Sequence, residues 1–351
     1  QEHMDFAYDN GMRALALTDH GNMNGLPHQV MHAKKMQEAG KDFKPIFGVE
    51  AYFISSLDDW HQEYEAAKED KKRRRTLSKD VTATTVEDED ASKKKVRNLL
   101  NRRRHLILLA QDQKGLNNLF SLISESFSSG NYYRYPRVDY ALLEKYSEGV
   151  IAASACLGGV YAGCLWENST YSDEGKRLGH DEEAVLDAMR TVTQKMVGVF
   201  GDRWYGELQW NNVAEQHILN KCIIKMHEEF GIPLISTSDS HYPNPDAWKD
   251  RELYKRLGWL GKSRPGYMSS ELPEGVEEVG YELYPRNGDQ MWEAYKKYSE
   301  ECATEYNDDT VLLSITNTHE IAHDRIESFL PDDEVRLPDF VVPAGETEES
   351  A

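Results

Sequence analysis

The sequence predicts an α/β fold, a distorted β/α barrel of parallel strands, and two observations lead to this prediction. Short apolar runs that are typical of buried strands alternate with amphipathic stretches of helical period. Residue types that bind metal ions lie at or near the ends of these runs, where a β/α barrel collects its active-site residues. The candidate ligands are Asp19, His20, Glu50, His105, Cys156, Asp239 and His241. Together they indicate a metal-dependent hydrolytic site.

The first half of the chain supplies three of the expected strands. A helical pattern over residues 2–11 comes first, and the strands ALALTDH, KPIFGVEAYF and HLILLA follow over 14–20, 44–53 and 105–110. A helix over 26–38, which Gly40 ends, should follow the first strand, and a helix over 115–127 should follow the third.

The second half repeats this alternation three times. Strands are predicted over 149–157, 204–210 and 233–242, with helices over 181–201, 214–231 and 246–261 after them. Repetition at this spacing predicts parallel strands joined by right-handed crossovers. Two closing helices are expected over 289–306 and 309–326. Six strands are therefore expected, with a seventh before Gln1.

Two stretches interrupt the alternation. Residues 55–104 carry the charged runs KEDKKRRR and EDEDASKKK, which predict a solvated or flexible insertion. The alternative is a basic arm that touches nucleic acid or a partner subunit, although the interleaved acids weaken it. Residues 262–280 predict a surface loop. We therefore expect a barrel domain over 1–325 and a linker over 326–351.

Composition limits the class of protein. The 351 residues carry a formal net charge of -20, so any contact with nucleic acid must come from local basic patches or metal ions. The four cysteines are scattered and form no CxxC pair, which favours a reducing cytoplasm. No apolar run approaches the roughly 18 residues of a membrane span, so no membrane partner is expected.

Three candidate ligands close the early strands. His20 is the strongest candidate, and Gly21 allows the sharp turn after it. Three interpretations of Asp19 are open: a second metal ligand, a carboxylate that orients His20, or a helix N-cap or turn residue. Glu50 follows an apolar strand and is hard to explain as core unless it is paired or metal-bound, and a buried salt bridge remains an alternative.

The later candidates differ in how strongly position supports them. Asp239 and His241 form a D-x-H pair, and residues two apart in an extended chain point to the same side. Cys156 on an apolar strand is more often a small buried hydrophobe. His105 begins its strand instead of ending it, so position alone predicts a surface histidine. Glu207 ends a strand too, and a structural role is at least as well supported.

The ligand types suit Zn²⁺, Mn²⁺ or Fe²⁺ better than Ca²⁺ or Mg²⁺. Ions held a few Å apart would clamp a phosphate and lower the pKa of a bridging water, so phosphoester hydrolysis fits best. The sequence contains no G-x-S-x-G elbow, Walker A loop or dinucleotide fingerprint.

Several ordered motifs resemble a known family. These are ALALTDHGNM, KPIFGVEAYF, HLILLAQDQKGLNNLFSLIS, YPRVDYALLEKYSEGVIAASACLGG, GIPLISTSDSHYPNPDA, ITNTHEIAHD and LPDFVVPAGETEES. They are similar to the N-terminal PHP (polymerase and histidinol phosphatase) domain of bacterial-type replicative DNA polymerase III alpha subunits. The resemblance covers nearly the whole chain except the charged insertion and the loop after Lys262.

The resemblance implies a distorted barrel of seven β/α units with up to three metal ions. Position by position, it implies that His20, Glu50, His105, Cys156, Asp239 and His241 are metal ligands, with His20, Glu50, Asp239 and His241 catalytic. It reverses the bland interpretations of Cys156 and His105 and leaves Asp19 only an outer role. The family's first motif, an H-x-H followed by an acidic residue, should lie before Gln1, and His3 is in the wrong element to replace it. We therefore expect a truncated chain that holds part of the cluster.

The resemblance leaves three functions open. The first is the PHP region of a DNA-directed DNA polymerase in replication, with a metal-dependent 3′-5′ exonuclease or phosphoesterase site for proofreading. Its implied partners are the primer 3′ end, the thumb and palm of the same polypeptide and other replisome subunits. The second is a structural PHP domain that braces the polymerase. The third is a free-standing phosphatase of the histidinol-phosphate type. The polymerase carboxylates should lie beyond Ala351, since Asp88 and Asp90 fall in the charged insertion.

Overall fold

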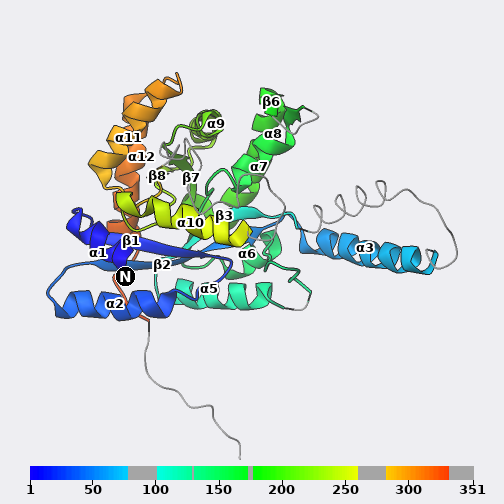
Figure 1. Cartoon of the computed structure of the whole chain (residues 1–351), viewed down its shortest axis with the longest axis horizontal. Coiled ribbons are helices and arrows are strands. Elements are labelled where there is room, and N and C mark those ends of the chain that lie inside the picture. Colours follow the sequence, from blue (N-terminus) through cyan, green and yellow to red (C-terminus); the bar gives the residue numbers. More distant parts are fainter. Residues whose placement is uncertain (78–100, 129, 173–176, 260–281, 332–351) are drawn as a thin grey trace, which may run out of the picture.

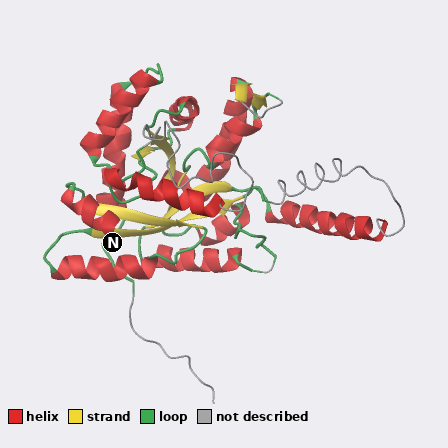
Figure 2. Cartoon of the chain, in the orientation of Figure 1, coloured by secondary structure: helices red, strands yellow, loops and turns green. Residues whose placement is uncertain are grey.

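A curled six-stranded sheet forms the centre of the molecule, with helices around it (Figures 1 and 2). The computed structural model describes residues 1–77, 101–128, 130–172, 177–259 and 282–331. Within them the strand order is β1-β2-β3-β4-β7-β8. The strands are β1 (Ala14–His20), β2 (Lys44–Phe53), β3 (Arg104–Ala110), β4 (Val150–Ala153), β7 (Trp204–Gln209) and β8 (Leu234–Thr237). All six predicted strands are present, and the curled sheet agrees with the distorted barrel.

The direction of β3 corrects the prediction that every strand is parallel. The pairs β1–β2, β4–β7 and β7–β8 are parallel, but β3 is antiparallel to both β2 and β4. A parallel neighbour requires one covering helix that returns the chain to the starting edge. Before β3, helix α3 (Leu57–Leu77) points away from the sheet (Figure 1), and after β3 two helices intervene, α5 (Gln113–Ser126) and α6 (Tyr140–Tyr146). Neither connection is a single covering helix.

Most predicted helices form within a few residues of their expected bounds. They are α1 (Glu2–Asp9), α2 (Leu26–Glu38), α5, α8 (Glu182–Phe200), α9 (Ala214–Phe230), α10 (Trp248–Trp259), α11 (Gly288–Glu301) and α12 (Asp308–Glu320), the last extended by the π-helix η3 (Ile321–Arg325). Short 3₁₀ turns η1 (Gly201–Arg203) and η2 (Pro245–Ala247) precede β7 and α10. Among the helices of the described residues, none is long and apolar enough to cross a membrane.

The segment between β4 and α8 contains elements that the sequence did not predict. Helix α7 (Val160–Glu167) is followed by the short strands β5 (Ser169–Tyr171) and β6 (Arg177–His180), which pair antiparallel. Six of the eight α7 residues are buried. A helix that is apolar on all sides lacks the amphipathic period by which helices are recognised in a sequence.

The start of the predicted charged insertion is part of the fold. Leu57 and Trp60 of α3 are buried, and the guanidinium carbon of Arg137 lies 4.6 Å from the Trp60 ring centroid. The expectation that residues 55–104 bury little therefore does not hold at this end. Residues 78–100, the predicted loop over 262–280 and the linker beyond residue 331 lie outside the described residues.

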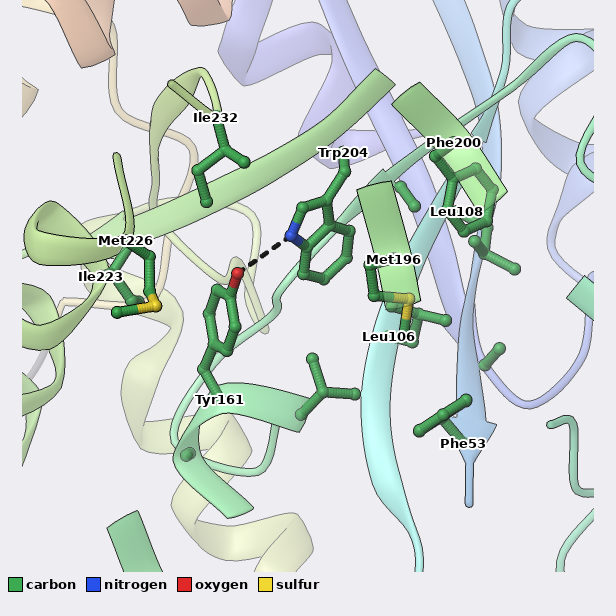
Figure 3. Packing of buried hydrophobic residues seen from close by; sticks show 14 of the residues in the cluster. Phe53, Leu106, Leu108, Tyr161, Met196, Phe200, Trp204, Ile223, Met226 and Ile232 are labelled. Atoms are coloured by element: carbon green, nitrogen blue, oxygen red, sulfur yellow. Dashed lines mark hydrogen bonds between the residues drawn. The ribbon is translucent and has the colours of Figure 1, made fainter. Parts of the chain in front are cut away.

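The core beneath the sheet joins α7 to β7. Trp204 and Tyr161 are fully buried, and the indole Nε1 of Trp204 donates a hydrogen bond of 2.9 Å to the Tyr161 hydroxyl (Figure 3). The same hydroxyl lies 2.6 Å from the Thr193 hydroxyl of α8. Buried polar groups are stable when paired in this way. This contact fixes α7 and α8 against the strand that carries Glu207.

Helix α12 covers the β8 edge of the sheet. The Thr318 hydroxyl donates a hydrogen bond of 3.0 Å to the carbonyl oxygen of Ser236 and accepts one of 3.2 Å from the backbone N–H of Ser236. The Asn317 amide donates to the Leu234 carbonyl at 2.8 Å. These side chains satisfy backbone groups that a neighbouring strand would otherwise pair.

Candidate metal centre

Strand register brings three predicted ligands together. In the parallel pair of β1 and β2, His20 lies opposite Glu50. In the antiparallel pair of β2 and β3, His105 lies opposite Tyr52, two residues beyond Glu50. Residues two apart in a strand face the same side, so His105 and Glu50 share one face of the sheet. The reversal of β3 explains why a histidine that begins its strand reaches the same edge as residues that end theirs.

The three side chains converge on one small volume. The Nδ1 atoms of His20 and His105 lie 3.0 Å and 2.5 Å from Oε1 of Glu50, and one ligand atom from each residue lies within 4.8 Å of the others. Although both nitrogens are in contact distance, Oε1 is buried and accepts no aligned hydrogen bond from the described residues. Two imidazole nitrogens and a carboxylate oxygen aimed at one point are a donor set that fits Zn²⁺, Mn²⁺ or Fe²⁺.

Glu50 is the buried anion of this group. Burial raises the pKa of its carboxyl, but the nearby imidazoles of His105 and His20 more than reverse that effect and bring the pKa to about 2. In return, the Glu50 carboxylate raises the pKa of His20 more than burial lowers it. Glu50 is only 4% exposed, whereas the His20 side chain is 48% exposed. The carboxylate of the group is therefore buried and charged, whereas the His20 side chain is open to solvent.

Cys156 lies beside this group, in the loop after β4. Its Sγ is 3.6 Å from Nδ1 of His105 and accepts a hydrogen bond of 3.4 Å from the backbone N–H of Gly158. Ala155 before it has a left-handed φ of +61°, which turns the chain toward β3. Burial strongly raises the pKa of the Cys156 thiol. The thiolate that binds metals therefore forms only where a cation offsets the cost of burying its charge.

Asp239 and His241 approach the group from the other side. Both follow β8, which ends at Thr237, and Asp239 has a left-handed φ of +48°, so the alternation of an extended strand does not place them. Nδ1 of His241 lies 3.7 Å from Oδ1 of Asp239, and the rings of His241 and His20 have centroids 6.0 Å apart. Burial raises the pKa of Asp239, and Glu50 raises it further. In the described residues these two are neighbours of the His20, Glu50 and His105 group and not members of it.

Asp19 forms a contact that belongs to the fold. Its Oδ2 accepts a hydrogen bond of 2.6 Å from the backbone N–H of Gly25, the residue that precedes α2. Unpaired N–H groups at a helix start are stabilised by such carboxylates. This contact agrees with the turn or capping interpretation of Asp19, and its outer role beside His20 stays a prediction.

Glu207 occupies the neighbouring part of the same sheet. It is also 4% exposed, and its Oε1 accepts hydrogen bonds from the Thr237 hydroxyl and the Gln209 amide. Burial raises its pKa to about 7. No histidine contacts it among the described residues, which agrees with a structural role.

Tyr52 is a site residue that we did not predict from the sequence. Its ring is stacked near His20 at a centroid distance of 6.4 Å, and it lies 5.8 Å from the His105 ring. Gly21, at φ +67°, leaves room for it, since a Cβ there would lie 2.8 Å from the Tyr52 ring. The signal was its position two residues after Glu50, on the same face of β2.

Comparison with known proteins gives a consistent result. A family model described as "PHP domain" matches residues 1–211. Proteins named DNA polymerase III subunit alpha are similar over longer spans: that of Aquifex aeolicus is 34% identical over 242 residues, and that of Campylobacter jejuni is 30% identical over 317. These alignments cover 68% and 90% of this chain. They cover 16% and 20% of the two relatives, so the chain spans only a small part of their length.

Proposed function

The chain belongs to the PHP domain family, and from this premise we propose that it is a metal-dependent phosphoesterase that removes nucleotides from a DNA 3′ end. The observation that carries the proposal is the convergence of His20, His105 and Glu50 around a buried carboxylate oxygen that no aligned donor satisfies. A buried carboxylate charge is costly unless nearby groups offset it, and a divalent ion held between the three side chains would do so together with the imidazoles. The two histidine nitrogens beside it make a divalent metal the best match.

The remaining predicted ligands extend the same site. We expect His20, Glu50 and His105 to hold one ion and Cys156, Asp239 and His241 to be further ligands, as part of a cluster that would reach up to three Zn, Mn or Fe ions in the complete domain. Such ions supply Lewis acidity and a water of lowered pKa. Glu50 stays ionised at neutral pH and supplies an anionic ligand, while the exposed side chain of His20 faces incoming substrate.

The wider context follows from the relatives. Because similar proteins are named DNA polymerase III subunit alpha, we propose that this chain acts in DNA replication as the PHP region of a DNA-directed DNA polymerase. Its partners would then be the primer 3′ end, the polymerase thumb and palm and other replisome subunits, in the cytoplasm. The exonuclease site would serve proofreading.

A structural PHP domain that braces the polymerase is the second candidate. One observation favours it: among the described residues, Asp239 and His241 are not in the group of three side chains that could hold a metal. In that case the ion pairs of Glu50 with the two histidines would serve stability alone.

The test measures metal content and digestion on the same protein. The full chain, dialysed against metal-free buffer, is analysed by plasma mass spectrometry and incubated with a labelled primer that carries a 3′ mismatch. We expect bound Zn, Mn or Fe and stepwise shortening of the primer that chelator stops and added metal restores. Absence of both metal and digestion would support the structural domain. Hydrolysis of small phosphomonoesters without digestion would instead support a histidinol-phosphatase-like enzyme.

A further inference from the structure

An arginine–tyrosine rim, defined as Tyr52, Arg103, Arg134 and Tyr135, borders the metal centre. Tyr52 links the two, because its ring faces His20 and His105 on one side and lies 5.4 Å from the Tyr135 ring on the other. The guanidinium carbon of Arg103 lies 3.7 Å from the Tyr135 ring centroid and 5.0 Å from that of Tyr52. Stacking on both rings holds the guanidinium of Arg103 next to the candidate ligands.

The charge of Arg103 is unmatched. Its Nη1 donates to the Asn101 carbonyl at 3.1 Å, its buried Nε has no hydrogen-bond partner, and no carboxylate in the described residues pairs with it. Its neighbour Arg102 behaves differently, since its Nη2 pairs with Glu63 at 3.0 Å. In a chain of net charge -20, a cation held by aromatic rings and left without an acid suggests an anion that arrives from outside.

Arg134 adds a second cation, on the segment that carries Tyr135. It is exposed, forms no ion pair in the described residues, and holds a left-handed φ of +62°, which is unfavourable for a non-glycine residue. Arg137 anchors this segment by donating to the carbonyls of Tyr133 and Tyr135 at 3.0 Å and 2.9 Å. The guanidinium carbon of Arg134 lies 5.6 Å from the Tyr133 ring centroid, so Arg134 adds a cation next to the segment that carries Tyr135.

We propose that the arginine–tyrosine rim binds single-stranded nucleic acid, with Arg103 contacting the phosphate adjoining the ester that is cleaved. Paired cations and aromatic rings are the usual means of binding a single strand without reading its sequence. This proposal rests on the proposed function. It says which residues beside the metal centre would bind the nucleotides of the substrate that are not cleaved.

Binding by metal-free protein tests the rim separately from catalysis. We expect Arg103→Gln to weaken binding of a short fluorescent oligothymidylate about tenfold in an anisotropy titration and to reduce the salt slope of log K by about 1. Arg103→Lys should restore part of the binding, because it keeps the charge but not the planar stack. The matched control is Arg190→Gln, since Arg190 is already paired with Glu183, Asp187 and Glu229. Unchanged affinity and salt slope in Arg103→Gln would overturn the rim.

The metal-loaded protein supplies the second measurement. Arg103→Gln should raise KM for oligonucleotide digestion about tenfold, with kcat nearly constant, because the lost contact is remote from the reacting ester. Hydrolysis of bis(p-nitrophenyl) phosphate, which has a single phosphodiester, should be unaffected. If the parent protein digests no oligonucleotide and the Arg103→Gln variant binds the strand more weakly, nucleic-acid binding by the rim is supported and the proposed function fails. If digestion proceeds with an unchanged KM in the variant, the proposed function stands and the rim fails.

Discussion

Glu50 on β2 and Glu207 on β7 are equally buried carboxyl groups of one sheet, yet their pKa values are shifted in opposite directions. Both are 4% exposed. The pKa of Glu50 falls to about 2, and the pKa of Glu207 rises to about 7. For both residues burial favours the neutral form, so the difference must come from what each carboxyl faces.

The side chains next to each carboxyl group differ between the two halves of the sheet. Glu50 faces two imidazoles from β1 and β3, whose contacts with the carboxylate lower its pKa by more than burial raises it. Glu207 faces the hydroxyl of Thr237 and the amide of Gln209, which hydrogen-bond to it but carry no charge. A buried carboxylate is therefore not by itself a metal ligand. In the described residues, the β1–β3 half brings two imidazoles to its carboxylate and forms a group that could hold a metal ion, whereas Glu207 in the β7–β8 half has uncharged hydrogen-bond partners.

The comparison is tested most strongly by the pair Glu50→Gln and Glu207→Gln. Removing a direct ligand should exceed the roughly 10–100-fold cost of losing an outer partner, so we expect Glu50→Gln to weaken metal binding about 1000-fold, or about 4 kcal/mol. Glu207→Gln should bind metal normally. Competition titration with a chromogenic chelator measures the metal affinity of both variants. An equal loss of affinity in the two would contradict the proposed difference between Glu50 and Glu207.

The pH dependence of stability tests the raised pKa of Glu207. Because the folded-state pKa of Glu207 is raised from 4.5 to about 7, its contribution to stability is greatest below pH 4.5 and is lost as pH rises toward 7. Glu207→Gln imitates the neutral carboxyl, so above pH 7 it should be more stable than the parent by up to about 3 kcal/mol.

Urea unfolding of both proteins between pH 4.5 and 8 measures this difference. It should be small at pH 4.5, grow as the pH rises to about 7, and level off above that, because the pH dependence is confined to the window between the unfolded and folded pKa values. A difference that does not change with pH would show that Glu207 is ionised in the folded protein.

Two cysteines, the half-buried Cys156 and the buried Cys164, give a second comparison with a smaller expected effect. Cys156 lies 3.6 Å from His105, whereas Cys164 is buried on α7, where burial raises its pKa to about 12. We expect Cys156→Ala to weaken metal binding more than about 100-fold, or about 2.7 kcal/mol, and Cys164→Ala to leave it unchanged. The same chelator competition applies, and a Cys156→Ala protein with full affinity would remove Cys156 from the ligand set.

Local patterns in the sequence were sufficient for much of the fold. The apolar runs located all six strands, and helix α2 has the bounds that its periodicity and Gly40 predicted. Helix α7 was missed because it is apolar on every side. Trp60 was missed because the charged run that follows it dominates the composition of its stretch.

The candidate site was only partly readable. His20 could be proposed because it ends the strand β1, and Glu50 because it follows the apolar run KPIFGV, although β2 continues to Phe53. His105 was first interpreted as a surface residue, since it begins β3, and only the reversal of that strand places it beside Glu50. Tyr52 could have been found only from its position two residues after Glu50, and Arg103 gave no signal in the sequence, because the rings that hold it come from other segments.

The sequence by itself determined where strands and helices form and which residue types stand at their ends, because hydrophobic period and turn chemistry are properties of neighbouring residues. The tertiary structure decided the direction of β3, since that depends on the path of the helices before and after it. It also decided which buried carboxyl is charged, because a pKa depends on side chains brought from other strands. Glu50 and Glu207 look alike in the sequence and differ only in what the fold places beside them.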